Sequence, residues 1–424
     1  MNQTTIFDMM YPKYKITKPL RVITLFSGYD SQCLALNYLG IKYEHWRTCE
    51  WAVKSIQALK DIHFTDDNFD YSKELSKDEL TNKLFNLGIS SNYNEPMPFS
   101  QINKLKEKEI RKIYNNIIAS KNMVNIQQVK GNNLGIENTN LFTYLLTYSF
   151  PCQDLSSAGL GKGMSDTSTR SGMLWEVERI LNECKENNKM PEILLMENVP
   201  DIHNYQNIAD FHKWQVKLEE LGYKSYWQDL NATDYGIPQS RNRCFMVSIL
   251  GNYSYTFPKP IPLKLKLKDI LEDNVDEKYF LSDKMIQGML TTNFRNYKLE
   301  NKLLDKEGIA NTIVARYEGS PQCIGTYQYA KSDKFMQGKD RLQLKKQISD
   351  TLQTTQKEGI VNANFEIRKL TPRECLRLMG FKDSFKIVVS DTAMYQQAGN
   401  SIVVDVLIAI LKQMDITQYG EADN

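Results

Sequence analysis

The sequence predicts an α/β fold with a mostly parallel sheet, and three observations support this prediction. First, the apolar runs at residues 21–26, 141–148 and 191–198 have the length and composition of buried strands. Second, segments with helical spacing alternate with these runs, and repeated strand–helix units indicate a parallel sheet covered on both faces. Third, the 424 residues leave room for a large core and a second domain.

The first predicted unit is a strand, a glycine turn and a helix. The strand covers residues 21–26, Gly28 breaks it, and the helix over 33–39 ends at Gly40. Residues 57–124 differ in character, because they are rich in Lys, Asp, Glu and Asn and contain helical pieces. We therefore expect a helical insertion there, lying on the surface or partly mobile.

The later part of the chain predicts a second domain and a C-terminal segment that completes the first domain. A helix that starts near Gly172 leads to the strand at 191–198, and one over 211–221 follows it. Closely spaced prolines then suit a linker, and a polar, short-stranded stretch predicts a smaller, irregular β-rich domain. Next, Thr371 predicts the start of a helix, and the apolar helix over 401–412 should pack on the first domain. The first predicted domain is 1–260 (with the 57–124 insertion), the second is 261–367, and the segment 368–424 completes the first.

Charge and composition narrow the class of protein. With 53 basic and 51 acidic residues, the net charge does not indicate nucleic acid, and any basic surface must be local. One such patch, residues 331–346, suits either DNA phosphates or a solvated loop face. Seven cysteines without CxxC spacing and four scattered histidines predict reduced thiols and no metal centre. No stretch approaches the ~20 apolar residues of a membrane span, so we expect a cytoplasmic protein.

Cys152 is the first candidate for chemistry. It follows the strand at 141–148, so it lies on the turn at the strand's carboxyl end. Ligands of open α/β sheets bind at this edge, and a thiol with a lowered pKa there is a nucleophile. A lone cysteine is more often structural, so the interpretation of Cys152 depends on the motifs around it.

Five motifs follow one another in a specific order. They are Phe26-Ser27-Gly28, Pro151-Cys152-Gln153, Glu197-Asn198-Val199, Gln239-Ser240-Arg241-Asn242-Arg243 and Gln397-Ala398-Gly399-Asn400-Ser401. In this order and spacing they resemble the bacterial and phage DNA (cytosine-5) methyltransferases over most of residues 20–260 and 366–412. The catalytic half is most similar to the mollicute enzymes that methylate CpG. The resemblance implies a Rossmann-like S-adenosylmethionine-dependent domain and a target-recognition domain.

The resemblance also implies a mechanism. A cytosine is flipped out of the duplex, and addition of the Cys152 thiolate to C6 makes C5 nucleophilic enough to attack a methyl group. Glu197 would quench the charge that develops at N3. Arg241 and Arg243 point to one face of a strand, where one would orient Glu197 and the base. Gln239 belongs to the same catalytic group.

S-adenosylmethionine is the implied cofactor. The resemblance places its methionine end near Phe26 and Gly28, its ribose on Glu50 and its adenine against Trp51. The other implied cofactor residues are Ser27, Asn125, Ile126, Pro151, Asn400 and Ser401. Two positions depart from the family pattern, because Asp30 stands where glycine is usual and Asn125 where aspartate often contacts the adenine. Both departures bear on cofactor affinity more than on function.

Double-stranded DNA is the implied partner. The loop at 156–169 carries three glycines and is predicted to close over flipped DNA, unless it is only a flexible surface loop. Residues 261–367 would read base edges and hold phosphates. The candidate DNA contacts are Ser156, Lys162, Arg170, Arg316, Lys339 and Arg341.

Two other functions are weighed against this one. A related enzyme acting on tRNA usually has a shorter recognition domain, so the length of 261–367 favours DNA. A catalytically inactive DNA-binding homologue would not need the complete set of catalytic motifs that this chain has. We expect a monomer in the bacterial cytoplasm, with a restriction endonuclease for the same site as a further partner.

Overall fold

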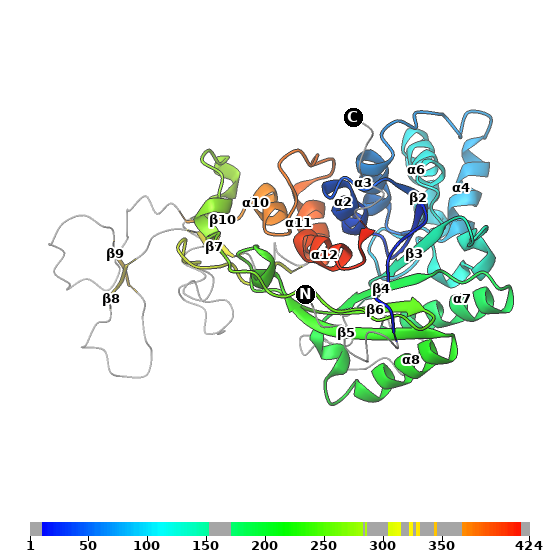
Figure 1. The fold of residues 1–424 in the computed structure, drawn as a ribbon. Coiled ribbons are helices and arrows are strands. Elements are labelled where there is room, and N and C mark those ends of the chain that lie inside the picture. Colours follow the sequence, from blue (N-terminus) through cyan, green and yellow to red (C-terminus); the bar gives the residue numbers. More distant parts are fainter. Residues whose placement is uncertain are drawn as a thin grey trace, which may run out of the picture.

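The centre of the protein is a six-stranded sheet with the order β2-β1-β3-β4-β6-β5 (Figure 1). The computed structural model describes residues 11–151, 171–282, 285, 304–314, 322–324, 328–330, 343–345 and 367–416. The six strands are β1 (Leu20–Leu25), β2 (Tyr43–Cys49), β3 (Thr143–Tyr148), β4 (Ile193–Asn198), β5 (Tyr223–Asn231) and β6 (Asn242–Leu250). Strands β1 to β4 run parallel, and β6 is antiparallel to both of its neighbours. The predicted mostly parallel sheet is therefore confirmed.

Helices cover both faces of this sheet. The α-helices are α2 (Ser31–Tyr38), α3 (Val53–His63), α4 (Lys77–Leu87), α5 (Phe99–Asn103), α6 (Glu107–Ala119), α7 (Leu174–Glu186), α8 (Ile208–Glu220), α10 (Pro372–Arg377), α11 (Asp391–Asn400) and α12 (Val404–Lys412). The short 3-10 helices are η1 (Ile126–Gln128), η2 (Gly131–Leu134), η3 (Ser171–Met173), η4 (Pro200–His203), η5 (Ala232–Tyr235), η6 (Leu267–Ile270) and η7 (Glu277–Tyr279). Gly40 and Gly222 adopt positive φ after α2 and α8, as the sequence predicts for helix ends.

Two hydrophobic cores lie on opposite faces of the sheet because side chains alternate along each strand. On β1, Val22 belongs to the core beneath α2, α10 and α12, whereas Ile23 belongs to the core beneath α7 and α8. On β3, Leu145 and Leu146 divide in the same way. Both faces of the sheet are thus buried. Polar side chains that contact a ligand are therefore expected at the carboxyl ends of the strands.

Helices α3 to α6 form a lobe of their own beside β2 (Figure 1). Its separate hydrophobic core contains Ile56 from α3, Leu80 and Leu84 from α4, and Ile110 and Ile113 from α6. The helical pieces predicted between 57 and 124 are therefore present, and the lobe begins slightly earlier, at α3. We call the segment from α3 to α6 the helical lobe.

The C-terminal segment returns to the sheet domain. At α10, Thr371 and Glu374 form the predicted capping box. The predicted helix over 401–412 is wrong at its start: α11 ends at Asn400, Ser401 has extended backbone (φ −75°, ψ 158°), and α12 begins at Val404. By length and composition the stretch Asp391–Lys412 could cross a membrane, but 72% of its apolar window is buried within the protein, as in a core element.

The described part of residues 261–367 is tied to the sheet domain. Leu267, Leu304 and Ile313 share the core that contains α12. The described strands beyond them are β7 (Cys323–Ile324), β8 (Gln328–Ala330), β9 (Gln343–Lys345) and β10 (Arg368–Lys369). They pair antiparallel as β10–β7 and β8–β9. The boundaries of a separate recognition domain stay a prediction.

Candidate active site at the ends of the parallel strands

A cavity of about 240 Å³ lies at the carboxyl ends of β1 to β4. Residues from segments far apart in the chain surround it. Of the predicted site residues that the structure describes, all but Gln239 line it: Phe26, Ser27, Gly28, Glu50, Trp51, Asn125, Ile126, Pro151, Glu197, Arg241, Arg243, Asn400 and Ser401. The fold therefore brings the predicted cofactor and catalytic residues into one space.

The turn after β1 forms one wall of the cavity. Phe26 and Gly28 have positive φ values of 58° and 54°, a conformation that glycine adopts easily and phenylalanine rarely. The Ser27 hydroxyl donates to the carbonyls of Thr24 and Cys49, which fixes the turn after β1 against the end of β2. The turn thus presents its backbone to the cavity in a fixed shape.

Glu50 follows β2 and has its carboxylate oriented by backbone groups. It accepts hydrogen bonds from the N–H groups of Gly28 (3.0 Å) and Ala52 (2.8 Å), and it is 6% exposed. Burial raises the pKa of Glu50, although these N–H groups favour its charged form. Its backbone is held by Asn122, whose side chain accepts from Glu50 N–H and donates to Glu50 C=O. Sequence reasoning missed the role of Asn122.

The adenine side of the predicted cofactor site contains Trp51, Asn125 and Ile126. The side-chain oxygen of Asn125 accepts from the Gln127 N–H at 3.1 Å and so caps the short helix η1. This oxygen has a second lone pair, so it can accept one further hydrogen bond from a ligand.

The catalytic end of the cavity is built around Glu197, the penultimate residue of β4. One carboxylate oxygen accepts from the Ser149 hydroxyl at 2.5 Å, and the other lies 3.2 Å from Nε of Arg243. The neighbouring Asn198 donates to the Phe150 carbonyl at 3.1 Å, which ties the end of β4 to the end of β3. Ser149 was in the sequence segment around Cys152, but its hydrogen bond to Glu197 requires the register of β3 with β4.

The two arginines of the fourth motif have different partners. Arg243 faces Glu197, whereas the Arg241 guanidinium donates to the carbonyls of Ile313, Gly399 and Ser401 at 2.8 to 2.9 Å. Arg241 is 3% exposed and joins the last turn of α11 to the sheet. The C-terminal motif is therefore held at the cavity by this arginine.

Gln239 does not line the cavity, and its assignment as a catalytic residue needs correction. Its side chain is completely buried, donates to the Leu378 carbonyl at 2.6 Å and accepts from the Ile313 N–H at 2.9 Å. Backbone groups occupy both ends of the side-chain amide, and these two hydrogen bonds hold the segment around Ile313 against the end of α10.

Several predicted residues fall outside the described part of the chain. These are Cys152 and the candidate DNA contacts Ser156, Lys162, Arg170, Arg316, Lys339 and Arg341. Pro151, the residue before Cys152, lines the cavity beside Phe150.

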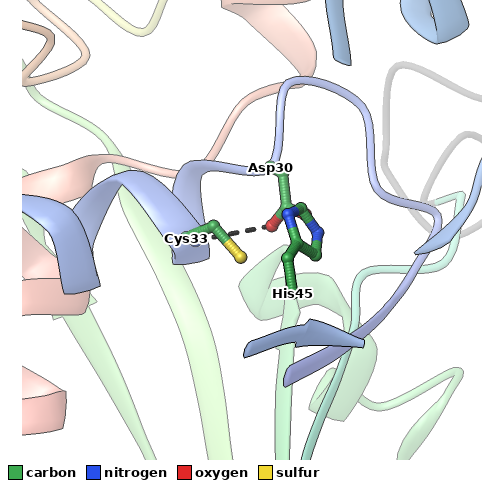
Figure 2. Close-up of side chains that lie close together, drawn as sticks. All are labelled: Asp30, Cys33 and His45. Atoms are coloured by element: carbon green, nitrogen blue, oxygen red, sulfur yellow. Dashed lines mark hydrogen bonds and ion pairs between the residues drawn. The ribbon is translucent and has the colours of Figure 1, made fainter. Parts of the chain in front are cut away.

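Asp30 does not line the cavity either, although it belongs to the turn after β1. Figure 2 shows its carboxylate facing His45 and Cys33. It lies 2.7 Å from Nε2 of His45, accepts from the Thr24 hydroxyl at 2.9 Å and caps α2 at the Cys33 N–H. Burial would raise the pKa of Asp30, but the nearby His45 and His63 outweigh it and lower that pKa.

Within the described part of the chain, two groups of possible metal ligands lie together despite the scattered histidines: Asp30, Cys33 and His45 in one, and His203, Asp229 and Cys244 in the other. In each group the histidine and the aspartate already form a direct pair, at 2.7 Å and 2.9 Å. The pairing of histidine with aspartate explains why the possible ligand atoms of each group lie close together.

Tyr93, Asn94, Ser55 and Gln397 also line the cavity. Tyr93 and Asn94 come from the helical lobe, for which the sequence suggested no role. Gln397 starts the last motif, but only the fold shows that its side chain points to the cavity wall.

A cavity of this composition, at the carboxyl edge of a mostly parallel sheet, is typical of α/β enzymes that bind a nucleotide-like cofactor. Residues 84–415 match the family described as C-5 cytosine-specific DNA methylase. The chain belongs to this family and is a sequence-specific DNA (cytosine-5) methyltransferase. The family implies S-adenosylmethionine as methyl donor and DNA as substrate.

Relatives support this assignment along almost the whole chain. The type II methyltransferase M2.ScrFI of Lactococcus lactis subsp. cremoris is 32% identical over 408 residues, covering 93% of this chain and 99% of the relative. The orphan methyltransferase M.SssI of Spiroplasma monobiae is 32% identical over 407 residues, covering 94% and 98%. The crystal structure of S. pombe Dnmt2 methyltransferase is similar in fold, with a TM-score of 0.58, 17% identity and coverage of 93% and 98%.

Proposed function

We propose that this chain methylates C5 of a cytosine in one short sequence of double-stranded DNA, with Cys152 as the nucleophile and S-adenosylmethionine as the donor. The observation that carries the proposal is that Glu197 and Glu50 line one cavity. Pro151, which precedes Cys152 in the sequence, lines it too. The carboxylate suited to the base and the carboxylate suited to the cofactor therefore share one cavity with the residue that precedes Cys152 in the sequence.

The residues of the cavity fit S-adenosylmethionine. Glu50 has a buried, oriented carboxylate that suits two ribose hydroxyls, and Trp51 offers an aromatic surface for adenine. The backbone of the turn after β1 suits the methionine end. When bound, this cofactor supplies an electrophilic methyl group. The remaining residues that would hold it are Phe26, Ser27, Gly28, Asn125, Ile126, Pro151, Asn400 and Ser401.

The chemistry requires a nucleophile and a group that manages charge on the base. The Cys152 thiolate adds to C6, and electron density moves to C5 and N3. Glu197 would stabilise N3 through a proton or hydrogen bond. Its position is fixed by Ser149 on one oxygen and Arg243 on the other. C5 would then bond to the methyl carbon while the bond from that carbon to the sulfonium sulfur breaks and S-adenosylhomocysteine leaves. A base would take the C5 proton, and the C6–S bond would break to release the Cys152 thiolate.

The DNA contacts and the target sequence are inferred from the resemblance to the family. We infer that residues 261–367 read the DNA sequence, with Arg316, Lys339 and Arg341 as candidate contacts. We also infer that Ser156, Lys162 and Arg170 contact the DNA around the flipped base. CpG is the first site to test, because the catalytic half resembles enzymes that methylate CpG. The relatives include both type II and orphan methyltransferases, so a partner endonuclease is a proposal, as are the monomeric state and the bacterial cytoplasm.

Bisulfite sequencing of DNA from cells that express the protein tests the proposal. We expect methylated cytosines in one short motif, and none in cells that express Cys152→Ser. The variant should still bind that DNA, because the fold and the phosphate contacts do not need the thiol. Methylation at a near-normal rate by Cys152→Ser would overturn the mechanism.

An absence of DNA methylation would bring the two alternative functions forward. Binding of S-adenosylhomocysteine together with cytosine-5 methylation of tRNA would favour the tRNA enzyme. No binding of S-adenosylhomocysteine would favour the inactive DNA-binding homologue.

A further inference from the structure

Among the residues that the structure describes, the helical lobe reaches the cavity at Ser55 on α3 and at the loop that follows α4. Tyr93 and Asn94 lie between α4 and α5, and both line the cavity with Glu50 and Trp51. Tyr93 is half-buried, and Asn94 is exposed at the cavity mouth. A lobe with a hydrophobic core of its own thus contributes part of the wall of the site.

This loop is fixed to the cofactor side of the cavity by its backbone. Ser90 N–H donates to the Trp51 carbonyl at 2.7 Å, and Val53 N–H donates to the Ser90 carbonyl at 2.9 Å. The Ser90 hydroxyl accepts from the Tyr93 N–H at 3.1 Å and donates to the Glu95 carbonyl at 2.7 Å. Ser90 therefore connects Trp51 to Tyr93 through two hydrogen bonds, one from its own N–H and one to its hydroxyl.

The phenol of Tyr93 is also fixed at its hydroxyl end. Its oxygen lies 2.6 Å from the Ser55 hydroxyl, which accepts from the Gln397 amide at 3.4 Å. Ser55 is 1% exposed and Gln397 is 3% exposed. These three side chains join the loop after α4, helix α3 and helix α11 around one side of the cavity. Burial and the nearby Glu50 raise the pKa of Tyr93, so the phenol stays protonated and keeps a donor.

We propose that Tyr93 is a cofactor-binding residue, and that the helical lobe completes the S-adenosylmethionine site through the Tyr93–Asn94 loop. The inference rests on the proposed function, because it assumes that this cavity holds the cofactor. The ring of Tyr93 packs on the cofactor beside Glu50, and its hydroxyl keeps Ser55 and Gln397 in place. The lobe therefore contributes to cofactor binding through this loop.

Equilibrium binding of S-adenosylhomocysteine, measured by calorimetry without DNA, tests the inference. Tyr93→Phe removes one hydrogen bond and should weaken binding about three- to tenfold. Tyr93→Ala also removes the ring and should weaken it more than Tyr93→Phe does. In steady state, Tyr93→Phe should raise the KM for S-adenosylmethionine, with kcat and DNA affinity unchanged.

Tyr71→Phe is the matched control. Tyr71 belongs to the same lobe, its hydroxyl donates to Asp67 at 2.8 Å, and it does not line the cavity. This variant should bind S-adenosylhomocysteine as the wild type does. If Tyr93→Ala fails to fold, Asn94→Ala replaces it, because Asn94 is exposed and its loss leaves the lobe core intact.

The outcomes separate the two proposals. A wild-type protein that does not bind S-adenosylhomocysteine would overturn the proposed function and this inference together. Tight binding by the wild type, with Tyr93→Phe and Tyr93→Ala or Asn94→Ala unchanged, would overturn the inference alone. An equal loss of binding in Tyr71→Phe would also overturn it, because the effect would then come from the stability of the lobe.

Discussion

Two buried carboxylates of this protein, Glu197 and Asp30, each pair with a basic side chain but lie in different surroundings. Glu197 lines the cavity, where Ser149 and Arg243 contact it. Asp30 is completely buried behind the turn after β1, where Thr24, Cys33 and His45 use its oxygens. Burial and charge pairing alone therefore do not identify a catalytic carboxylate. Access to the cavity makes the difference.

This comparison also explains why an aspartate at position 30, in place of the usual glycine, need not weaken cofactor binding. Asp30 stands where the family usually has glycine, and its backbone has a positive φ of 59°. Such a conformation costs an aspartate less than most residues, and the helix cap and the His45 pair offset that cost. Because the side chain points away from the cavity, the turn can present the same backbone to the cofactor as a glycine would.

The largest expected effect comes from replacing each of the two carboxylates separately and comparing the two variants. Glu197→Gln should lower kcat by about 100- to 10,000-fold, because a general acid contributes on that order, while the free energy of unfolding stays close to wild type. Asp30→Asn should do the opposite, with loss of about 2 kcal/mol of stability and little change in kcat. Methylation kinetics and urea unfolding of both variants measure this contrast. A Glu197→Gln enzyme with normal kcat would remove Glu197 from the mechanism.

The second prediction concerns the pH dependence of stability behind the turn. Burial lowers the pKa of His63 to about 4, against the opposing effect of Asp30. The unfolded chain takes up this proton near pH 6.5, so stability should fall as pH drops from about 6.5 towards 4. Asp30 has a lowered pKa, so its contribution is lost only below about 4. Because the His63 ring is half-buried, solvent screens part of the effect, and we expect about 2 kcal/mol.

Urea unfolding at a series of pH values measures this effect. His63→Gln should flatten the curve between pH 6.5 and 4, because glutamine does not titrate and can still donate to the Tyr29 carbonyl that His63 contacts. His212→Gln is the control, since His212 is exposed on α8 and should leave the curve unchanged. A wild-type protein equally stable at pH 7 and pH 4 would contradict the prediction.

The same comparison shows what the sequence could and could not predict. Strand ends carry polar motifs that are local in sequence, so Glu197, Glu50 and the turn after β1 could be assigned before the fold was known. The partners of these residues come from elsewhere: Ser149 reaches Glu197 through the β3–β4 pairing, and His45 reaches Asp30 through the β1–β2 pairing. Such contacts depend on strand order and register, which periodicity does not specify.

Other differences have equally local causes. Gln239 belongs to the same motif as Arg241 and Arg243, but its amide is taken up by the backbone of Leu378 and Ile313 and does not line the cavity. Because β6 begins only at Asn242, strand alternation does not determine the direction of the residues before it. Helix α11 was missed because its only long apolar side chain is Met394, so it shows little of the periodicity that marks an amphipathic helix. Tyr93 had no sequence signal at all, since its role depends on a loop between two helices of a polar segment.

The smallest expected effect concerns the second departure from the family, Asn125. Asn125→Asp keeps the acceptor for the Gln127 N–H and adds a charge, and charge-assisted hydrogen bonds are about twice as strong as neutral ones. Burial of a new carboxylate opposes this gain, because Asn125 is 5% exposed. With two donors available, the Gln127 N–H and the adenine amine, we expect about threefold tighter binding of S-adenosylhomocysteine at pH 7.

Asn122→Asp is the matched control for this change, because Asn122 lies three residues earlier and is also buried. Its amide group donates to the Glu50 carbonyl, and an ionised aspartate cannot donate, so this variant should bind the cofactor product more weakly. Calorimetry on both variants measures the difference. Weaker binding by Asn125→Asp would mean that the cost of burying charge exceeds the gain at the adenine. The uncharged residue would then be the better choice at this position of the cavity wall.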